Sequence, residues 1–511
     1  MPRPLLLLCL LLLLLPACCS CMQAVLVSDV HYDPFYGTPR AYGRCVVPSP
    51  PLGAPACESS AGLVTSLSED IGPTASYYMF VGGDLQRHAF SIEDHHINDT
   101  FGFVVEKLAG AFQPAAHNDT SAVVVAAGNN DMVPDYYFDV SKPASKILQE
   151  ESKLMQKYGV LALEEAKQFE KCAYYLRVIS STLRVIVLHS LLWCHTIYPP
   201  ISDAENDPCG QFEFLTTELA NARKARAKVI IMSHIPPYVD SWKLLHAGRF
   251  TAVSENMFWK PKYQARFNKL MREYVDTVTV QLYGHVHLFS FQALTGGVPS
   301  FVIPATTPLY KNLPSYFIAR LSDEDFALRG LTQRYLSKGA WTNGLSVEDV
   351  LGDLTNISSL QASARRLMTD DSLWSKFLAL RAGGVEDDSL FPSKSCDAWC
   401  RASIACTMFS DTWEDIAACV SASTKHPPHE AEDSKMRIAV PIFLSLIFFL
   451  LLLSIALMIL HRLRQRRRAE YAQEAHGEWT VPASALRAGT ENGVEVHQEQ
   501  MEVKLQDNNR S

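Results

Sequence analysis

Five short apolar runs in this chain each end in residues that can bind metal ions, and this recurrence limits the fold more than any other feature. β-Branched residues fill the runs and amphipathic stretches separate them, a pattern that predicts an α/β layered domain. The carboxyl ends of parallel strands lie at one edge of a sheet. We therefore expect the five polar ends to meet at one site. They are Asp29-Val-His31, Gly82-Gly-Asp84-Leu-Gln-Arg-His88, Gly128-Asn-Asn-Asp131, His234-Ile-Pro-Pro237 and Gly284-His-Val-His287.

The same patterns predict the organisation of the chain. Strands are expected at 24–28, 77–81, 122–126, 183–188, 228–232 and 277–282, and helices at 97–112, 145–158 and 212–227. After about residue 337 the chain becomes helical and polar, with helices expected at 346–354 and 360–380. We therefore expect an α/β domain over residues 21–336 and a small helical, cysteine-containing region over residues 337–425.

Two segments at the ends of the chain predict export and membrane insertion. Residues 1–20 combine one Arg, a Leu-rich run and small residues, which is typical of a cleaved signal peptide. Residues 438–460 carry no charge and precede a basic run at 461–468, so they predict a transmembrane helix with a cytosolic tail over 461–511. A polar linker at 426–437 joins this helix to a domain that faces a lumen or the cell exterior.

The cysteines and sequons agree with an oxidising compartment. Proximity along the chain suggests the pairs Cys45–Cys57, Cys194–Cys209, Cys396–Cys400 and Cys406–Cys419, with Cys172 left over, although sequence alone does not fix connectivity. A zinc knuckle at 396–400 is the alternative, but no His follows at ligand spacing. Asn98, Asn118 and Asn356 are expected to carry N-glycans.

The overall charge argues against nucleic acid as a partner. The formal net charge is −8 and the isoelectric point about 6.1, so the chain has no strong basic field. In the expected catalytic domain, the nearest thing to a basic cluster for a polyanion is Lys260, Lys262, Arg266 and Lys269. We interpret it as a solvated helix face rather than a polyanion site.

The types of ligand at the strand ends indicate the chemistry. Two Asp, one Asn and four His supply oxygen and nitrogen donors without thiolates, which suits zinc, manganese or iron ions. Seven donors are too many for one tetrahedral ion, but they suit two ions if Asp84 bridges them. Such a pair can clamp a phosphoryl group and activate a water. Each of the five ends, taken singly, is more often a structural turn.

In this order, the five ends resemble the calcineurin-like metallophosphoesterases, and the chain looks closest to the acid sphingomyelinase-like phosphodiesterases. The resemblance covers about residues 23–420 and includes the spacing of the last four cysteines. Besides the five ends, it rests on Asp29-Val-His-Tyr-Asp-Pro-Phe-Tyr36, Gly210-Gln-Phe-Glu-Phe-Leu215, Ser233-His-Ile-Pro-Pro237 and Pro304-Ala-Thr-Thr-Pro-Leu-Tyr310.

The resemblance implies a four-layer α/β/β/α sandwich and phosphoester hydrolysis by a metal-bridging hydroxide. It also implies how two divalent ions, with zinc preferred, would be held. The first ion would take Asp29, His31, Asp84 and His287, and the second Asp84, Asn129, His234 and His285.

Two positions depart from the family pattern. Asn130 stands where relatives carry a His that helps to protonate the leaving group, and an amide can only donate a hydrogen bond to a phosphoryl oxygen. We therefore assign the acid role to His88, with a solvent-facing or supporting histidine as the alternative. His189 stands where relatives carry Asn, and it either lines the cleft or merely ends a strand.

These features predict a membrane-anchored phosphodiesterase acting on sphingomyelin-like or nucleotide phosphodiesters. The Gly128-Asn-Asn-Asp131 spelling is also similar to that of endopolyphosphatases, so cleavage of internal phosphoanhydride bonds is the alternative within the same chemistry. A non-catalytic surface receptor or scaffold is the alternative of another class.

Overall fold

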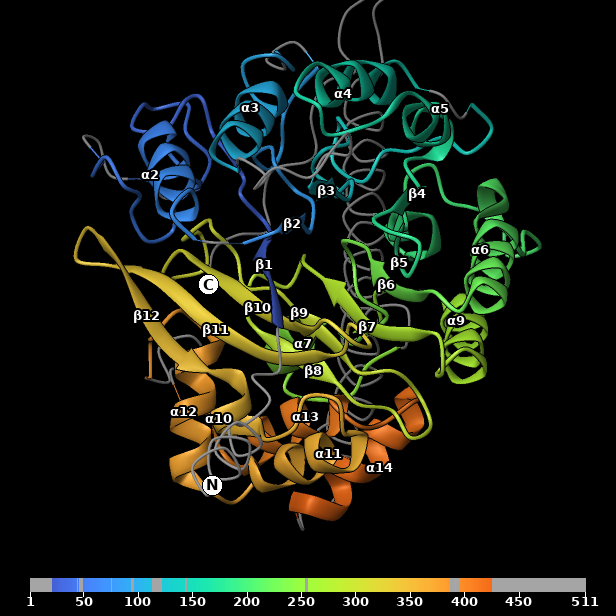
Figure 1. Cartoon of the computed structure of the whole chain (residues 1–511). Coiled ribbons are helices and arrows are strands. Elements are labelled where there is room, and N and C mark those ends of the chain that lie inside the picture. The colour runs from blue at the N-terminus through green and yellow to red at the C-terminus, as the bar shows by residue number, and fades with distance from the viewer. Residues whose placement is uncertain are drawn as a thin grey trace, which may run out of the picture. The chain divides into compact units, whose positions relative to one another are not determined.

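A computed structural model describes residues 21–424, except 44, 46–48, 75, 93–95, 113–121, 143–144, 253–255, 387–390 and 392–394 (Figure 1). The expected signal peptide, membrane segment and cytosolic tail lie outside these residues, as does Asn118. Within the described part, none of the helices combines the length and the apolar character needed to cross a bilayer.

Two mixed six-stranded sheets form the centre of the domain. The first has the order β12-β11-β10-β1-β2-β3, in which β1, β2 and β3 are parallel. Its strands are β1 (Cys21–Val27), β2 (Tyr78–Val81), β3 (Val123–Val125), β10 (Ser315–Ser322), β11 (Leu328–Ser337) and β12 (Ala340–Ser346).

The second sheet has the order β4-β5-β6-β7-β9-β8, with β5, β6, β7 and β9 parallel and an antiparallel strand at each edge. Its strands are β4 (Tyr175–Val178), β5 (Leu183–Val187), β6 (Lys228–Met232), β7 (Val278–Tyr283), β8 (Ser290–Gln292) and β9 (Ser300–Val302). The α/β architecture expected from the sequence is therefore confirmed.

One apolar core joins the two sheets. Val25 and Val124 of the first sheet belong to the same buried cluster as Ile186 and Ile231 of the second. Each such side chain contributes about 1.5–3 kcal/mol when it leaves water. Because side chains on both faces of these central strands are buried, the strands appear in the sequence as continuous apolar runs.

Helices cover the sheets in three groups that are visible in Figure 1. The first group is α2 (Ala61–Ile71), α3 (Phe101–Ala111), α4 (Lys146–Lys157) and α5 (Leu163–Cys172), packed one against the next. The second is α6 (Gln211–Ala225) and α9 (Pro261–Glu273), beside the second sheet. The third follows the strands and contains α10 (Val347–Leu351), α11 (Ile357–Arg366), α12 (Asp371–Arg381), α13 (Ala398–Thr407) and α14 (Trp413–Thr424), with α13 also contacting α7 (Ser241–Ala247).

Three elements differ from the sequence expectation. The helix expected at 97–112 begins only at Phe101, because residues 97–100 form turns. Residues 340–346, expected in the helical region, form β12 after a turn in which Lys338 and Gly339 both have positive φ. The helix expected at 360–380 is two helices, since the Asp370 carboxylate caps a new helix by accepting a hydrogen bond from the Leu373 amide at 3.0 Å.

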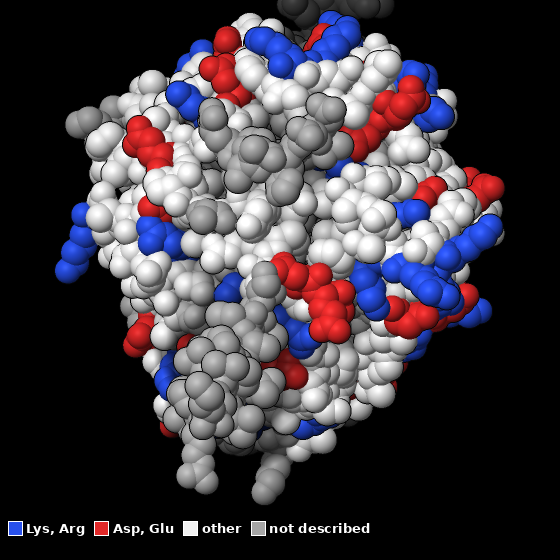
Figure 2. Space-filling view, viewed as in Figure 1, with Lys and Arg blue, Asp and Glu red and all other residues white. Residues whose placement is uncertain are grey.

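Surface charges are interspersed on the face drawn in Figure 2, without a broad patch of one sign. Three basic residues at the start of α9, Lys260, Lys262 and Arg266, have local partners in the loop that precedes α6. Lys260 forms an ion pair with Asp203 at 2.8 Å, and Lys262 donates to the carbonyls of Asp203 and Glu205. These contacts agree with a solvated helix face.

Three of the four expected disulfides are present: Cys45–Cys57, Cys396–Cys400 and Cys406–Cys419. The predicted Cys194–Cys209 pair is wrong. Cys209 bonds to Cys172, whose Cα lies 6.4 Å away although the two are 37 positions apart in sequence. Helix α5 ends beside the short turn η2 (Pro208–Gly210), whereas Cys194 is buried and its thiol donates to the Ser190 carbonyl at 3.2 Å. Proximity along the chain therefore did not predict the partner of Cys209.

Disulfide mapping of the unreduced protein tests this pairing. We expect a linked peptide pair that contains Cys172 and Cys209, with the Cys194 thiol alkylated only after unfolding. Cys172→Ser should lower the free energy of unfolding by about 2–4 kcal/mol, since it opens a long loop, and Cys194→Ala should cost less. Recovery of a Cys194–Cys209 peptide would contradict the structure.

Candidate metal centre

The predicted donors come from five adjacent strand ends of the two sheets. Strands β1, β2 and β3 deliver Asp29, His31, Asp84 and Asn129, and strands β6 and β7 deliver His234, His285 and His287. Backbone hydrogen bonds continue the strand pairing into the turns: the Asp29 amide donates to the Gly83 carbonyl at 3.1 Å, and the Gly284 amide to the His234 carbonyl at 2.9 Å.

Five of these donors sit on backbone with positive φ. The values are +49° for Asp29, +47° for His31, +51° for Asp84, +69° for His285 and +63° for His287. For residues other than Gly, this conformation costs roughly 1–3 kcal/mol each and persists only where the surroundings enforce it. Its concentration here indicates a site that the fold holds in place.

Asp84 occupies the middle of the cluster. Its Oδ2 lies 2.9 Å from His234 Nε2 and 3.6 Å from His31 Nε2. On one side, His31 Nε2 lies 3.8 Å from Asp29 Oδ1, and His287 Nε2 lies 3.5 Å from the same oxygen. On the other, Asp84, His234 and His285 form a second group that could hold an ion. One carboxylate thus stands between two sets of donors.

Asp131 fixes the turn that carries Asp84. Its buried carboxylate accepts hydrogen bonds from the amides of Asp84, Leu85 and Gly128 at 3.0, 2.8 and 2.8 Å. Burial, reinforced by the charge of Asp84, raises the pKa of Asp131 to about 6. A Cβ at position 128 would lie 2.0 Å from Asp84 Oδ1, so only glycine lets the two turns approach this closely. Asp131 belongs to the motif Gly128-Asn-Asn-Asp131, but the sequence alone does not indicate its role.

A chain of amide contacts orients Asn129. Asp135 Oδ2 accepts from Asn130 Nδ2 at 2.7 Å, and Asn130 Oδ1 accepts from Asn129 Nδ2 at 2.6 Å. With its nitrogen engaged, Asn129 turns its Oδ1 towards His234 Nε2, 3.1 Å away. The carboxylate of Asp135 therefore sets the direction of the Asn129 oxygen, a function that the sequence did not reveal.

The histidines divide into two electrostatic classes. Burial acts to lower the pKa of His31, but Glu58, Asp29 and Asp84 outweigh it and raise the value to about 10. Burial is likewise outweighed at His234, where Asp84 raises the pKa to about 9. Burial holds the pKa of His285 and His287 well below the ordinary value. For Asp29 and Asp84, burial is overcome by the neighbouring histidines, which lower the pKa of both carboxyl groups.

This donor set fits divalent cations. The Nε2 atoms of His31 and His287 face each other at 3.1 Å, and the buried Nδ1 atoms of both rings have no hydrogen-bond partner. The Nδ1–H of His234 donates to the Gly82 carbonyl at 2.6 Å, which leaves Nε2 directed at the cluster, as is usual for a metal-binding His. Buried imidazoles that converge with two carboxylates are the arrangement that a cation stabilises.

His88 lies at the edge of this cluster. Its ring stacks on His31 at 4.2 Å with an interplanar angle of 7°, and Tyr42 stacks on it at 5.2 Å. Its Nδ1 lies 2.6 Å from Oε1 of the buried Glu58, whose Oε2 accepts a hydrogen bond from Thr307 Oγ1. Nδ1 is thus engaged by a carboxylate, and one ring nitrogen of His88 lies within 4.8 Å of nitrogens of His31 and His287. Nothing in the sequence marked Glu58, which follows a cysteine in a loop.

A cavity of about 270 Å³ opens beside the cluster. Its lining includes Asp84, His88, His285 and His287. Its walls include Tyr136, Trp242, Phe258 and Tyr310. Tyr310 stands edge-on to the His287 ring at 4.7 Å, and Trp242 lies 6.1 Å from Tyr310. An aromatic groove therefore leads to the donors.

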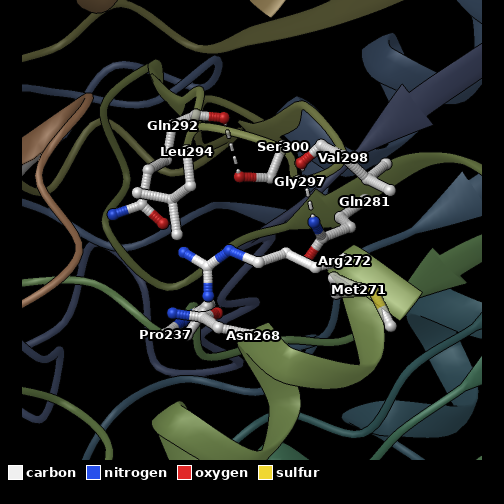
Figure 3. Close-up of a pocket in the computed structure, with 10 residues that line it drawn as sticks. All are labelled: Pro237, Asn268, Met271, Arg272, Gln281, Gln292, Leu294, Gly297, Val298 and Ser300. Carbon is white, nitrogen blue, oxygen red and sulfur yellow. Dashed lines mark hydrogen bonds between the residues drawn. The ribbon is translucent and has the colours of Figure 1, made fainter. Parts of the chain in front are cut away.

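Two other places are not part of this site. Figure 3 shows a cavity around Arg272 and Ser300 whose volume is about 10 Å³, which is room for little more than a water. His189 is buried in the core, where Nδ1 lies 3.1 Å from the Cys172 carbonyl and the ring stands edge-on to Phe138. It is not among the residues that line the larger cavity, so the interpretation of a strand-end residue is favoured.

No protein-family model matches the chain. Similar proteins include the human acid sphingomyelinase-like phosphodiesterase 3b, 27% identical over 297 residues that cover 56% of this chain and 60% of that protein. The human cyclic GMP-AMP phosphodiesterase SMPDL3A is 27% identical over 338 residues, covering 61% and 69%. An endopolyphosphatase from Cryptococcus neoformans is 27% identical over 199 residues, covering 38% and 26%.

These similarities accompany the complete set of donors in the expected order. The chain is similar to acid sphingomyelinase-like phosphodiesterases, with 27% identity to each of the two human proteins. The family resemblance inferred from the motifs is thereby confirmed. The match nevertheless spans only 60% of the length of the first of these relatives.

Metal loading of this protein should release protons. His31 and His234 have pKa values raised to about 10 and about 9, so both imidazoles are protonated at pH 7 in the metal-free protein. A metal binds only the unprotonated nitrogen. We expect about two protons to be released per chain at pH 7, and fewer as the pH rises past 9. Calorimetric titration with Zn²⁺ in buffers of different ionisation enthalpy measures this number; heats that do not depend on the buffer would contradict it.

Proposed function

We propose that this protein is a metal-dependent phosphodiesterase with two divalent ions. The observation that carries the proposal is the position of Asp84 Oδ2, 2.9 Å from a nitrogen of one donor set and 3.6 Å from a nitrogen of the other. A single carboxylate shared between two buried donor sets is what a dinuclear site requires.

The proposed ligands follow from this geometry. The first ion would be held by Asp29, His31, Asp84 and His287, and the second by Asp84, Asn129, His234 and His285. When bound, two such ions lower the pKa of a coordinated water and neutralise charge on a phosphoryl group. The four imidazole donors favour zinc over magnesium or calcium.

The remaining polar groups would act on the substrate itself. We assign proton donation to the leaving oxygen to His88 Nε2, since Glu58 fixes Nδ1 and the ring lines the cavity. Asn130 uses one of its two amide hydrogens on Asp135. Its other hydrogen is available to a phosphoryl oxygen. Phosphodiesters, either nucleotides or sphingomyelin-like head groups, are the proposed substrates.

Endopolyphosphatase activity is a second candidate for the same site. Two observations favour it: the similarity to the fungal endopolyphosphatase, and an Asn at position 130 instead of a proton-donating His. A phosphate leaving group scarcely needs a proton, so this substitution harms phosphoanhydride cleavage less than phosphodiester cleavage.

The organisation of the whole chain is also part of the proposal. We propose a signal peptide at 1–20, a four-layer catalytic domain at 21–336, a helical region at 337–425, a linker at 426–437, a membrane helix at 438–460 and a cytosolic tail at 461–511. The four disulfides support placing the domain in a lumen or outside the cell. The exposed side chains of Asn98 and Asn356 would accept N-glycans.

A substrate panel on the purified full-length protein tests the proposal. The panel holds bis-p-nitrophenyl phosphate, ATP, sphingomyelin and long-chain polyphosphate, and metal content is measured on the same sample. We expect close to two zinc ions per chain and hydrolysis of the phosphodiester. Selective shortening of polyphosphate without diesterase activity would establish the second candidate, and a metal-free, inactive protein would indicate a receptor or scaffold.

Two substitutions separate metal binding from proton donation. Asp84→Ala should empty both metal positions, because it removes the shared carboxylate. His88→Ala should keep the metal but lower kcat about 100-fold or more on a substrate with a poor leaving group. The loss should be smaller with bis-p-nitrophenyl phosphate, whose leaving group needs little protonation. Unchanged turnover of His88→Ala on both substrates would assign the acid elsewhere.

A further inference from the structure

Arg381 is the one buried arginine, among the described residues, that lacks an acidic partner. Three arginines of this part of the chain are buried: Arg87, Arg177 and Arg381, at 8%, 2% and 4% exposure. Arg87 pairs with Asp33 at 3.2 Å, and Arg177 pairs with Glu165 at 2.5 Å. No carboxylate of the described residues forms an ion pair with Arg381.

The neighbours of Arg381 satisfy only part of its guanidinium. Nη1 donates to the Phe289 carbonyl at 3.2 Å, and Nη2 lies 3.5 Å from Ser241 Oγ. Nε is buried and has no partner. Burial lowers the pKa of Arg381 to about 10, a value at which the group is still charged at neutral pH. Among the described residues this charge has no counter-ion, and an unpaired buried charge is costly.

The position of Arg381 indicates where a partner for this charge would bind. It lines the same cavity as Asp84, His88 and His287, together with Ser241. At the end of α12, its carbonyl also accepts from the Phe289 amide at 2.9 Å, two residues beyond His287. Asp240 lines the cavity as well, but it is the cap of α7 and lies 3.4 Å from Lys243. Arg381 thus borders the cavity that the donors also line.

We propose that Arg381 binds a second phosphate of the substrate, one that neighbours the phosphate undergoing hydrolysis. This inference rests on the proposed phosphodiesterase function and narrows its substrate class to molecules with a diphosphate or longer phosphate chain. A planar guanidinium with free N–H groups matches two phosphate oxygens. Sphingomyelin carries a single phosphate, so it would leave Arg381 without an anion. A nucleoside polyphosphate and inorganic polyphosphate would both supply one.

Inhibition of bis-p-nitrophenyl phosphate hydrolysis tests the proposal with non-hydrolysable probes. Methylenediphosphonate is compared with methylphosphonate, and adenosine 5′-(α,β-methylene)diphosphate with AMP. The full-length, metal-loaded protein should bind each two-phosphorus probe about tenfold more tightly than its one-phosphorus partner. In Arg381→Gln this preference should fall by about tenfold, and Arg381→Lys should keep part of it because the charge remains.

Lys243→Gln is the matched control, since it removes one positive charge from the wall of the same cavity. The preference of Lys243→Gln for two-phosphorus probes should equal that of the unchanged protein, because Lys243 is exposed and already paired with Asp240. Comparing the adenosine probes with the phosphonate probes separates inorganic polyphosphate from nucleotides as the source of the second phosphate. A preference for two phosphorus atoms in both pairs points to the phosphate chain itself. A preference in the adenosine pair alone points to nucleotides. An equal preference in Arg381→Gln and the unchanged protein would overturn the proposal.

Protection against thermal unfolding by the same probes gives a readout that does not depend on turnover. It also distinguishes failure of the proposed phosphodiesterase function from failure of the proposed role of Arg381. A protein that does not hydrolyse bis-p-nitrophenyl phosphate would contradict the proposed function. A protein that hydrolyses it but gains no extra protection from the two-phosphorus probes would contradict only the role of Arg381. If Arg381→Gln unfolds, Arg381→Lys carries the same comparison.

Discussion

The carboxylate of Asp84 is the contact on which the arrangement of the site depends. It stands between imidazoles from both sheets, and its turn is held by Asp131 from the next strand end. A Cβ at position 128 would collide with the Asp84 carboxylate. Glycine at this position therefore allows the two strand ends to approach each other closely. Because the sheets share one core, the packing that stabilises the domain also sets the distance between the two donor sets.

The helices near the C-terminus complete the cavity without supplying any proposed metal ligand. Helix α12 places Arg381 beside the segment that follows His287, and Phe391 also lines the cavity. Helix α7 contributes Trp242 and packs against α13. The strand ends would therefore determine the chemistry, and the later helices would determine what fits next to it.

Much of the fold and of the proposed metal site could be predicted from the sequence, because the patterns that indicate them are local. An apolar run that ends in Asp-x-His predicts a strand and its turn, and such motifs contain all seven proposed ligands. The features that were missed depend on distant contacts. Nothing in the sequence marks that Glu58 meets His88, that Cys172 rather than Cys194 lies near Cys209, or that Arg381 lines the cavity. Strand β12 was missed for a different reason, since its hairpin turn consists of Lys338 and Gly339 and resembles a polar helical stretch.

The positive φ values of five donors have a consequence for the stability and abundance of the protein. The backbone of these residues carries unfavourable conformational energy, roughly 1–3 kcal/mol for each residue. Ions that bind only the folded chain offset this energy by mass action. The supply of metal where the chain matures would then govern how many molecules escape degradation, and scarcity of metal would reduce its abundance as well as its activity.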